Sequence, residues 1–282
     1  MKLIADSGST KTDWVLLDGD NQRHGFKSEG INPFFHTPET VAETLAKISF
    51  EPFAHADITE VFFYSAGTSN ERNRKIMEEG FRKEFPESKL YIMHDLLGAA
   101  RALFSDDSGI ACIMGTGSNS CLYEGGKITE NLGGHGYILG DEGSGMHIGR
   151  KVVRDFMSDL MPPHALAAFN AEFGLTKDEI SYAVYKKSFP NRYLASFSKF
   201  VQQHIDQPYF AALADDAFMK FFERYIIQYP DYRNRPVRIL GSVGYYYEAQ
   251  VRRRAMVYGI DIDKIIQAPI DGLVDYHLSH EA

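Results

Sequence analysis

The sequence predicts an α/β fold built from two related domains. Strand-like runs alternate with amphipathic helix patterns, a glycine-rich loop between two strand-like runs occurs twice, and no low-complexity linker separates the halves. Strands that alternate with helices are typical of layered α/β architectures. At 282 residues the chain is long enough for two domains of ordinary size, which we place at residues 1–106 and 107–282.

The first half begins with three strands and continues with alternating helices and strands. Asp18-Gly19-Asp20 predicts a tight hairpin turn, and Thr37-Pro38 is typical of a helix start, with Thr as N-cap and Pro in the first turn. The predicted elements are strands at 2–5, 13–18, 23–28, 60–67 and 89–95, a helix after Thr37, an amphipathic helix at 70–85, and a helix that ends near Phe104.

The same order begins again at Gly109, which predicts a duplicated hairpin domain. Strands at 109–114, 119–123 and 127–130 enclose a glycine loop at 115–119 and a turn at 124–126. We align Gly8 with Gly117. Two unrelated hairpins are the alternative, because α/β proteins often contain more than one. Beyond residue 142 the pattern is largely helical, apart from a strand that enters the Gly-Ser turn at 241–242 and a shorter strand near 262–266.

Composition excludes several classes of protein. A formal net charge of −8 without a long basic run argues against a nucleic-acid binder. Cys112 and Cys121 are too few for a disulfide framework and form no C-x-x-C metal pattern, which favours a reducing compartment. No apolar signal segment opens the sequence and no stretch approaches the roughly 20 apolar residues that span a bilayer. We therefore expect a soluble cytoplasmic protein with no membrane partner.

The two glycine loops have the composition of phosphate cradles. Glycines after a strand expose backbone N–H groups that can converge on one cluster of oxygens. The first loop adds hydroxyl groups from Ser7, Ser9, Thr10 and Thr12, and the second adds those of Thr116 and Ser118. Asp6 repels phosphate unless a cation intervenes, so its position suggests Mg²⁺. For each loop taken alone, a plain hairpin turn is the alternative.

Three motifs together carry a family resemblance. "DSGSTKTDW", "GTGSN" and "GGHGYILGDEGSG" resemble the N-acetylglucosamine kinase group within the BadF/BadG/BcrA/BcrD-type ATPase family, part of the superfamily of sugar kinases, actin and chaperone ATPases. The resemblance implies duplicated ribonuclease-H-like (actin-like ATPase) domains with a helix-rich second domain. It also implies ATP and Mg²⁺ as cofactors, with ATP in an interdomain cleft beside a hexose, and a homodimer.

By the same resemblance, the nucleotide and its metal are assigned to residues of both halves. Asp6 is implied to position Mg²⁺, and Gly241 and Ser242 to contact adenine or ribose, although a strand-to-helix turn alone also explains the last two. The residues implied to bind the phosphates are Gly8, Ser9, Thr10, Lys11, Thr12, Gly115, Thr116, Gly117 and Ser118.

Asp95 is the implied catalytic base. "YIMHDLLGAA" places it where a strand ends and a helix begins, and the resemblance implies that it accepts the proton of the sugar hydroxyl. Phosphoryl transfer relies mainly on positioning and charge balance, which a carboxylate that orients the nucleophile supplies. The alternative is a helix N-cap, a common position for Asp.

The sugar contacts implied by the resemblance are Asn32, Asn119, Gly134, His135 and Asp141. Asp141-Glu142 also fits charge compensation at a helix start, and Asn32 an Asn-Pro turn. Related proteins commonly carry Trp where this chain has His135, so the sugar stays open among N-acetylglucosamine, glucosamine and N-acetylmuramic acid.

We therefore expect an ATP- and Mg²⁺-dependent kinase that phosphorylates an amino sugar, first of all N-acetylglucosamine at its 6-hydroxyl. One alternative is an ATPase that activates a dehydratase through an iron–sulfur cluster, although the two cysteines lie within predicted strands. Another is a sugar- or nucleotide-binding sensor without turnover.

Overall fold

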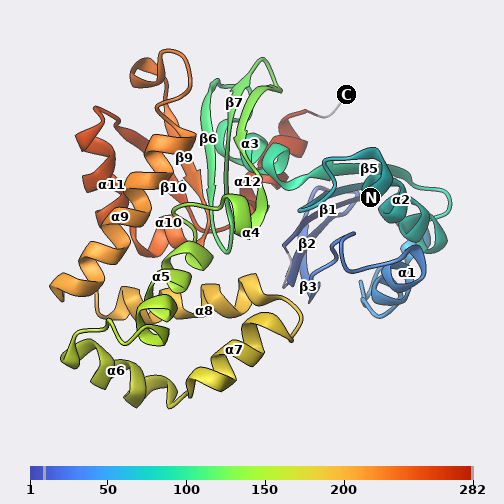
Figure 1. The fold of residues 1–282 in the computed structure, drawn as a ribbon. Coiled ribbons are helices and arrows are strands. Elements are labelled where there is room, and N and C mark those ends of the chain that lie inside the picture. The colour runs from blue at the N-terminus through green and yellow to red at the C-terminus, as the bar shows by residue number, and fades with distance from the viewer. Residues whose placement is uncertain (9–10, 281–282) are drawn as a thin grey trace. The chain divides into compact units, whose positions relative to one another are not determined.

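The computed structural model describes residues 1–8 and 11–280 and divides into two compact units (Figure 1). The first unit contains Met1–Asp106 and the C-terminal segment from Ala268, and the second contains Asp107–Gln267. Each unit is built on a five-stranded mixed sheet covered by helices. The α/β prediction is therefore confirmed.

In the first unit, three antiparallel strands continue into two parallel ones. The sheet order is β3-β2-β1-β4-β5, with β1 antiparallel to β2 and parallel to β4. The strands are β1 (Lys2–Ser7), β2 (Lys11–Leu17), β3 (Arg23–Glu29), β4 (Glu60–Ser65) and β5 (Lys89–His94). The helices are α1 (Pro38–Ala46), α2 (Glu71–Glu84), α3 (Asp95–Phe104), α12 (Ile270–Ser279) and the short 3-10 helix η1 (His55–Asp57).

Both faces of this sheet are buried, and the alternation of side chains decides which helices each residue meets. Leu3 and Ala5 of β1 pack in the cluster that includes Val41 of α1 and Phe81 of α2. Ile4 points the other way, into the cluster with residues of α3 and α12. Because side chains on a strand alternate with period two, Asp6 lies on the same face as Ile4.

The second unit repeats this plan. Its sheet has the order β8-β7-β6-β9-β10, with β6 antiparallel to β7 and parallel to β9. The strands are β6 (Gly109–Met114), β7 (Ser118–Glu124), β8 (Lys127–Gly133), β9 (Val237–Leu240) and β10 (Ile262–Ile266). Two sheets with the same order and the same sequence of strand directions confirm the predicted duplication.

The alignment of the two glycine loops needs a correction. Ser7 pairs with Thr12 where the first loop closes, and Met114 pairs with Ser118 where the second closes. Gly8 therefore corresponds to Gly115, which also directly follows its strand, and the predicted match with Gly117 is wrong. The second loop is one residue shorter, which the sequence comparison could not place.

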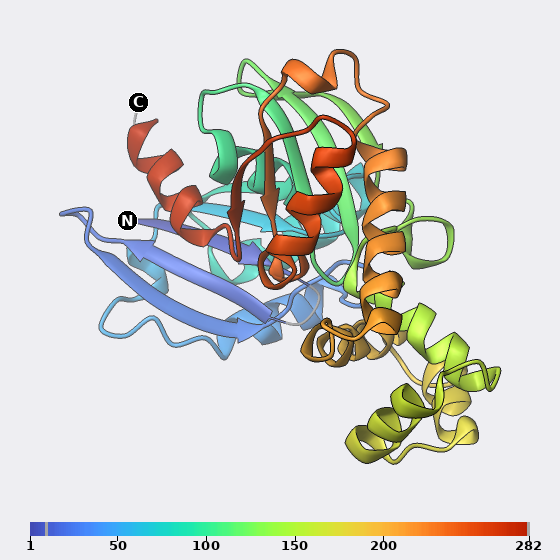
Figure 2. The ribbon, with the colours of Figure 1, turned by 90° about the vertical axis from the view of Figure 1, so that its left-hand side faces the viewer.

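Helices make up the rest of the second unit. Buried residues of α5, α8 and α9 join those of the sheet in one core, while α6 and α7 lie farther from the strands (Figures 1 and 2). The helices are α4 (Gly136–Leu139), α5 (Gly145–Met157), α6 (Pro163–Phe173), α7 (Lys177–Tyr185), α8 (Pro190–Gln203), α9 (Pro208–Tyr225), η2 (Tyr232–Asn234), α10 (Ser242–Tyr246) and α11 (Glu248–Val257).

The expected domain boundary at 106/107 coincides with the unit boundary, but the assignment of residues 268–282 to the second domain does not hold. Leu273 and Val274 of α12 are buried with Ile4 against the first sheet. Tyr64 of β4 and His277 of α12 are joined by a 2.9 Å hydrogen bond between Oη and Nε2. Figure 2 shows α12 beside the N-terminal strand.

Gly272 permits the close packing of α12 on α3. A Cβ atom at Gly272 would lie 2.5 Å from the carbonyl oxygen of Ala102, and backbone cannot move aside as a flexible side chain can. We expect Gly272→Ala to lower the free energy of unfolding by roughly 1–3 kcal/mol, because this overlap outweighs the gain of about 1 kcal/mol in helix propensity. Urea unfolding measures the change.

Gly25→Ala is the matched control, since no atom lies within 4 Å of a Cβ built there on β3. A Gly272→Ala protein that unfolds at the same urea concentration as the parent would contradict this account of the helix contact.

Candidate functional site

Two carboxylates meet at the carboxyl end of the first sheet. Asp6 lies near the end of β1, and Asp95 is the first residue of α3, which covers the same sheet face. Asp13, opposite Asp6 in the antiparallel register, lies on this face as well. The β1–β2 hairpin therefore places Asp6 beside Asp13, and the strand order brings Asp95, from a distant part of the sequence, to the same end of the sheet.

Burial and mutual repulsion change the acidity of this pair. The pKa of Asp6 is raised to about 7, first by burial and then by the neighbouring charges of Asp95 and Asp13, while Lys11 acts in the opposite direction. Burial also raises the pKa of Asp95, although its carboxylate accepts a 2.8 Å hydrogen bond from the N–H of Leu96. Both side chains keep some exposed surface, yet protein atoms surround them closely enough for desolvation to dominate. The edge therefore favours a proton or a cation.

Asp95 does not cap its helix. The N-cap of α3 is His94, whose Nδ1 accepts the N–H of Leu97 at 3.2 Å. The alternative that Asp95 serves as N-cap is therefore wrong, and its role as catalytic base stays a prediction.

The first glycine loop is tied from within. The N–H of Gly8 donates to the carbonyl oxygen of Lys11 at 3.0 Å. Thr12 is buried, and its hydroxyl bonds to Ser7 at 2.7 Å and to the carbonyl of Glu29 at 3.1 Å, so it faces the protein interior instead of an open cradle. Lys11 is exposed and pairs with Asp13 at 2.7 Å. Ser9 and Thr10, two of the predicted phosphate contacts, lie outside the described residues.

Asn32 lies near the same sheet edge. The hydroxyls of Ser7 and Ser65, at the ends of β1 and β4, both donate to the carbonyl of Ile31 at 2.9 Å. The Asn32 side chain is buried, and its Oδ1 accepts the N–H of Phe34 at 2.9 Å, as in the expected Asn-Pro turn. The turn and a role in sugar binding are compatible, because an amide has further donors.

In the second unit, the glycine loop lies against the start of α5. The N–H of Gly115 bonds to the carbonyl of Gly117 at 2.9 Å, which closes the loop. Gly145 and Met146, the first residues of α5, donate their N–H groups to the carbonyls of Gly115 and Thr116 at 2.9 and 3.1 Å. The loop is thereby held in one conformation.

Asp141 contacts this loop directly. Its Oδ1 accepts the N–H of Ser118 at 3.0 Å, and the hydroxyl of Ser118 donates to the carbonyl of Glu142 at 2.7 Å. A Cβ at Gly117 would lie 3.0 Å from the Asp141 carboxylate, so glycine leaves room for it. The N-cap of α5 is Ser144, and Asp141 and Glu142 precede it, so they are not the first-turn acids that the helix-start alternative expected.

Asn119, Gly134 and His135 form a neighbouring group. Gly133 and Gly134 both have positive φ angles and pack against the Asn119 amide, whose Oδ1 accepts an N–H of Asn131 at 2.8 Å. His135 is exposed and lines a cavity of about 410 Å³ together with Glu142 and Arg224.

Gly241 meets the other side of the second loop. Its φ of +124° and a Cβ position 2.4 Å from the carbonyl oxygen of Met114 exclude a side chain. Ser242, exposed, begins α10. The structure therefore brings residues 114–118, Asp141 and Gly241 together in the second unit, as it brings Asp6 and Asp95 together in the first.

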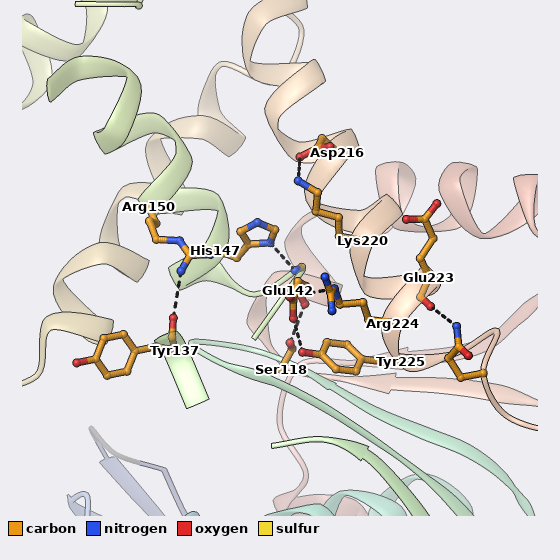
Figure 3. Close-up of polar contacts among 12 residues, drawn as sticks. Ser118, Tyr137, Glu142, His147, Arg150, Asp216, Lys220, Glu223, Arg224 and Tyr225 are labelled. Carbon is orange, nitrogen blue, oxygen red and sulfur yellow. Dashed lines mark hydrogen bonds and ion pairs between the residues drawn. The ribbon is translucent and has the colours of Figure 1, made fainter. Parts of the chain in front are cut away.

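Sequence reasoning missed the side chains that support Asp141. Glu142 accepts a hydrogen bond from the hydroxyl of Tyr225 and pairs with Arg224 at 3.2 Å, while His147 accepts the N–H of Gly143 at 2.9 Å (Figure 3). No spacing in the sequence connects α9 with this turn, so no sequence signal could have found the contacts to Tyr225 and Arg224.

The described part of the chain contains neither a cluster of side chains that could hold a metal ion nor a helix that could span a membrane. Among residues 1–8 and 11–280, no three or more His, Cys, Asp or Glu side chains lie close enough to hold a metal ion by themselves. Within the same residues, no helix combines the length and apolar character that crossing a bilayer requires.

Comparisons with known proteins agree with this architecture. The model of the BadF/BadG/BcrA/BcrD ATPase family matches residues 5–207. A solved structure from Porphyromonas gingivalis, provisionally named an N-acetylglucosamine kinase, is 37% identical over 100% of both chains, with a TM-score of 0.93. One from Chromobacterium violaceum with the same provisional name is 16% identical over 98% of both chains, with a TM-score of 0.75. That likeness shows the fold alone. Together the matches confirm the predicted resemblance.

The raised pKa of Asp6 generates a prediction about stability. An acid whose pKa is raised on folding stabilises the protein below its unfolded pKa, and this contribution is lost as the pH rises toward the folded value of about 7. We therefore expect Asp6→Asn to gain stability relative to the parent, by much more at about pH 8 than at about pH 5. The expected difference is roughly 2–3 kcal/mol, because the free energy of unfolding changes by about 1.4 kcal/mol per pH unit between the two pKa values. Urea unfolding at both pH values measures it.

Asp20→Asn, which replaces an exposed carboxylate in the β2–β3 turn, is the control and should show no such change. A stability gain for Asp6→Asn that is equal at the two pH values would show that the Asp6 carboxylate is neither desolvated nor repelled by its neighbours.

Proposed function

We propose that this chain, which belongs to the BadF/BadG/BcrA/BcrD ATPase family, transfers the γ-phosphoryl group of ATP to the 6-hydroxyl of an amino sugar, most specifically N-acetylglucosamine. The observation that carries the proposal is the half-buried Asp6–Asp95 pair, whose pKa values are raised. The full-length likeness to the Porphyromonas gingivalis protein supports the choice of sugar.

Asp95 has the properties of the base. A carboxylate whose pKa is raised by burial is a better proton acceptor than an ordinary surface Asp, and the hydrogen bond from the N–H of Leu96 fixes its orientation. In phosphoryl transfer such a group mainly orients the attacking hydroxyl. Asp95 would therefore hold the 6-hydroxyl and accept its proton.

Asp6 fits a magnesium ion. Mg²⁺ typically uses one or two carboxylates together with substrate phosphates and water, so a dedicated cage of three side chains is not required. The repulsion that raises the pKa of Asp6 would be relieved by a cation. When bound, the ion would neutralise charge on the phosphates of ATP.

In the second unit we assign the phosphates to residues 115–118. The N–H groups of Gly115 and Ser118 are bonded to Gly117 and Asp141, which leaves those of Thr116 and Gly117 as the donors proposed for phosphate. Gly241 and Ser242 are proposed to contact adenine or ribose. Asn119, Gly134, His135 and Asp141, with Asn32 of the first unit, are proposed for the sugar.

The burial of the cysteines argues against the dehydratase-activator alternative. Cys112 and Cys121 are fully buried within β6 and β7, and burial raises both thiol pKa values, that of Cys121 to about 12. Cluster ligands must be thiolates. These two cysteines are core residues.

An ADP-release assay across hexoses tests the kinase proposal, and Asp95→Asn tests the base. We expect sugar-stimulated ADP release by the parent, with kcat reduced by about 10²- to 10⁴-fold in Asp95→Asn, because the proton acceptor is lost. Calorimetry should show sugar binding retained in the variant. Asp20→Asn serves again as control.

No stimulation of the parent by any amino sugar would overturn the kinase assignment and favour a non-catalytic sensor. Equal loss of turnover and of sugar binding in Asp95→Asn would instead show that Asp95 has a structural role.

His135 tests which sugar is bound. We expect His135→Ala to raise KM for the preferred sugar about three- to tenfold with little change in kcat, because one hydrogen bond of roughly 1 kcal/mol is lost equally in substrate and transition state. Kinetics with N-acetylglucosamine, glucosamine and N-acetylmuramic acid measure the effect. His164→Ala, an exposed position on α6, is the control. An unchanged KM for all three sugars would remove His135 from the sugar site.

A further inference from the structure

The turn of residues 141–144, here called the Asp141 turn, has a backbone that needs outside support. Asp141 has a φ of +62° and Gly143 a φ of +79°, so the chain enters the left-handed region twice within three residues. For Asp this conformation is uncommon and persists only where surrounding groups enforce it. The turn also carries the carboxylate that accepts the N–H of Ser118 beside the glycine loop.

Side chains from three elements hold the turn (Figure 3). The hydroxyl of Ser118 on β7 donates to the carbonyl of Glu142. On α9, Tyr225 donates its hydroxyl to the Glu142 carboxylate, and Arg224 pairs with it. On α5, His147 reaches back to Gly143.

The contact of His147 is with the backbone itself. Nδ1 accepts the N–H of Gly143 at 2.9 Å, and the N–H of His147 donates to the Ser144 hydroxyl at 3.1 Å. Burial lowers the pKa of His147 to about 4, with further contributions from Arg150, Lys151 and Lys220, so the ring is neutral near pH 7. A neutral ring with Nδ1 as acceptor carries its proton on Nε2.

Packing restricts Gly143 from the other direction. A Cβ there would lie 2.6 Å from the Cβ of Phe221, so the backbone of Gly143 is already pressed against α9. The imidazole of His147 and the side chain of Phe221 together restrict the backbone of Gly143 to one conformation. Asp141, two residues earlier, is placed by the same restraint.

We propose that His147 is a positioning residue of the phosphoryl-transfer site: by accepting the N–H of Gly143 it fixes the Asp141 turn, and through Asp141 it fixes the N–H of Ser118 at the end of the glycine loop. The proposal rests on the kinase function proposed above. His147 touches neither substrate in this scheme and acts only through Asp141.

Two substitutions separate this role from simple filling of space. His147→Leu fills similar space with an apolar side chain that has no hydrogen-bond acceptor. His147→Asn instead places an amide oxygen close to the position of Nδ1. We expect kcat/KM for the sugar to fall at least tenfold in His147→Leu and to stay within about threefold of the parent in His147→Asn. His204→Leu, which replaces a half-buried imidazole stacked on Phe210, is the matched control.

A double-mutant cycle with Asp141→Ala shows whether the effect passes through Asp141. Coupled residues give non-additive effects, while independent ones give additive effects. We expect His147→Leu to cost less than twofold in the Asp141→Ala background. An undiminished loss in that background, or a His147→Leu enzyme as active as the parent, would overturn the proposal.

Amide hydrogen exchange supplies a readout that does not depend on activity. We expect the amides of Gly143 and Ser118 to exchange at least tenfold faster in His147→Leu and at the parental rate in His147→Asn, because only the first loses the acceptor. Unchanged exchange would refute the proposal that His147 fixes the Asp141 turn, even if the kinase assignment stands. If the parent shows no sugar-dependent turnover but the variants show this exchange pattern, the kinase function is refuted, while the conclusion that His147 fixes the Asp141 turn stands.

Discussion

The site depends on the close approach of Asp6 and Asp95 at a poorly hydrated edge of the first sheet. Alternation along β1 places Asp6 on the face that α3 covers, and α3 begins at Asp95. Desolvation and mutual repulsion then make two charged carboxylates unfavourable there, which the raised pKa values express. A proton or a divalent cation relieves that cost, and the roles proposed for Asp95 and Asp6 rest on this property.

Only the first of the two sheets carries acidic residues at these strand positions. The positions of Asp6 and Asp13, which face each other across β1 and β2, correspond to Ile113 and Asn119 across β6 and β7. The strands of the second copy therefore lack these carboxylates, and the carboxylate beside its glycine loop is that of Asp141, which accepts the N–H of Ser118. The same sheet plan thus carries two strand carboxylates beside the loop of the first unit and uncharged strand residues beside the loop of the second, where the carboxylate of Asp141 comes from the turn before α5.

The sequence predicts the strands and the duplication well because period-two alternation and turn residues are local signals. It assigns α12 to the wrong unit because the apolar residues Leu273 and Val274 show that a helix face is buried without showing which sheet covers it. The sequence also predicts that the hydroxyl of Thr12 is available to bind phosphate. In the structure the strand register pairs Thr12 with Ser7, so this hydroxyl points into the protein interior, which the sequence alone does not reveal. The contacts of Tyr225 and His147 with the Asp141 turn depend on tertiary packing and leave no spacing to detect.

The second loop also shows how a helix can act on a site that its own N–H groups do not reach. The first N–H groups of α5 are bonded to the carbonyls of Gly115 and Thr116, so the helix terminus is not itself the anion site. A hydrogen bond accepted at a carbonyl polarises the peptide and strengthens donation by the N–H on its other side. The two donors proposed for phosphate, the N–H groups of Thr116 and Gly117, belong to the same peptide groups as the carbonyls of Gly115 and Thr116. The hydrogen bonds from α5 to these carbonyls therefore strengthen both donors.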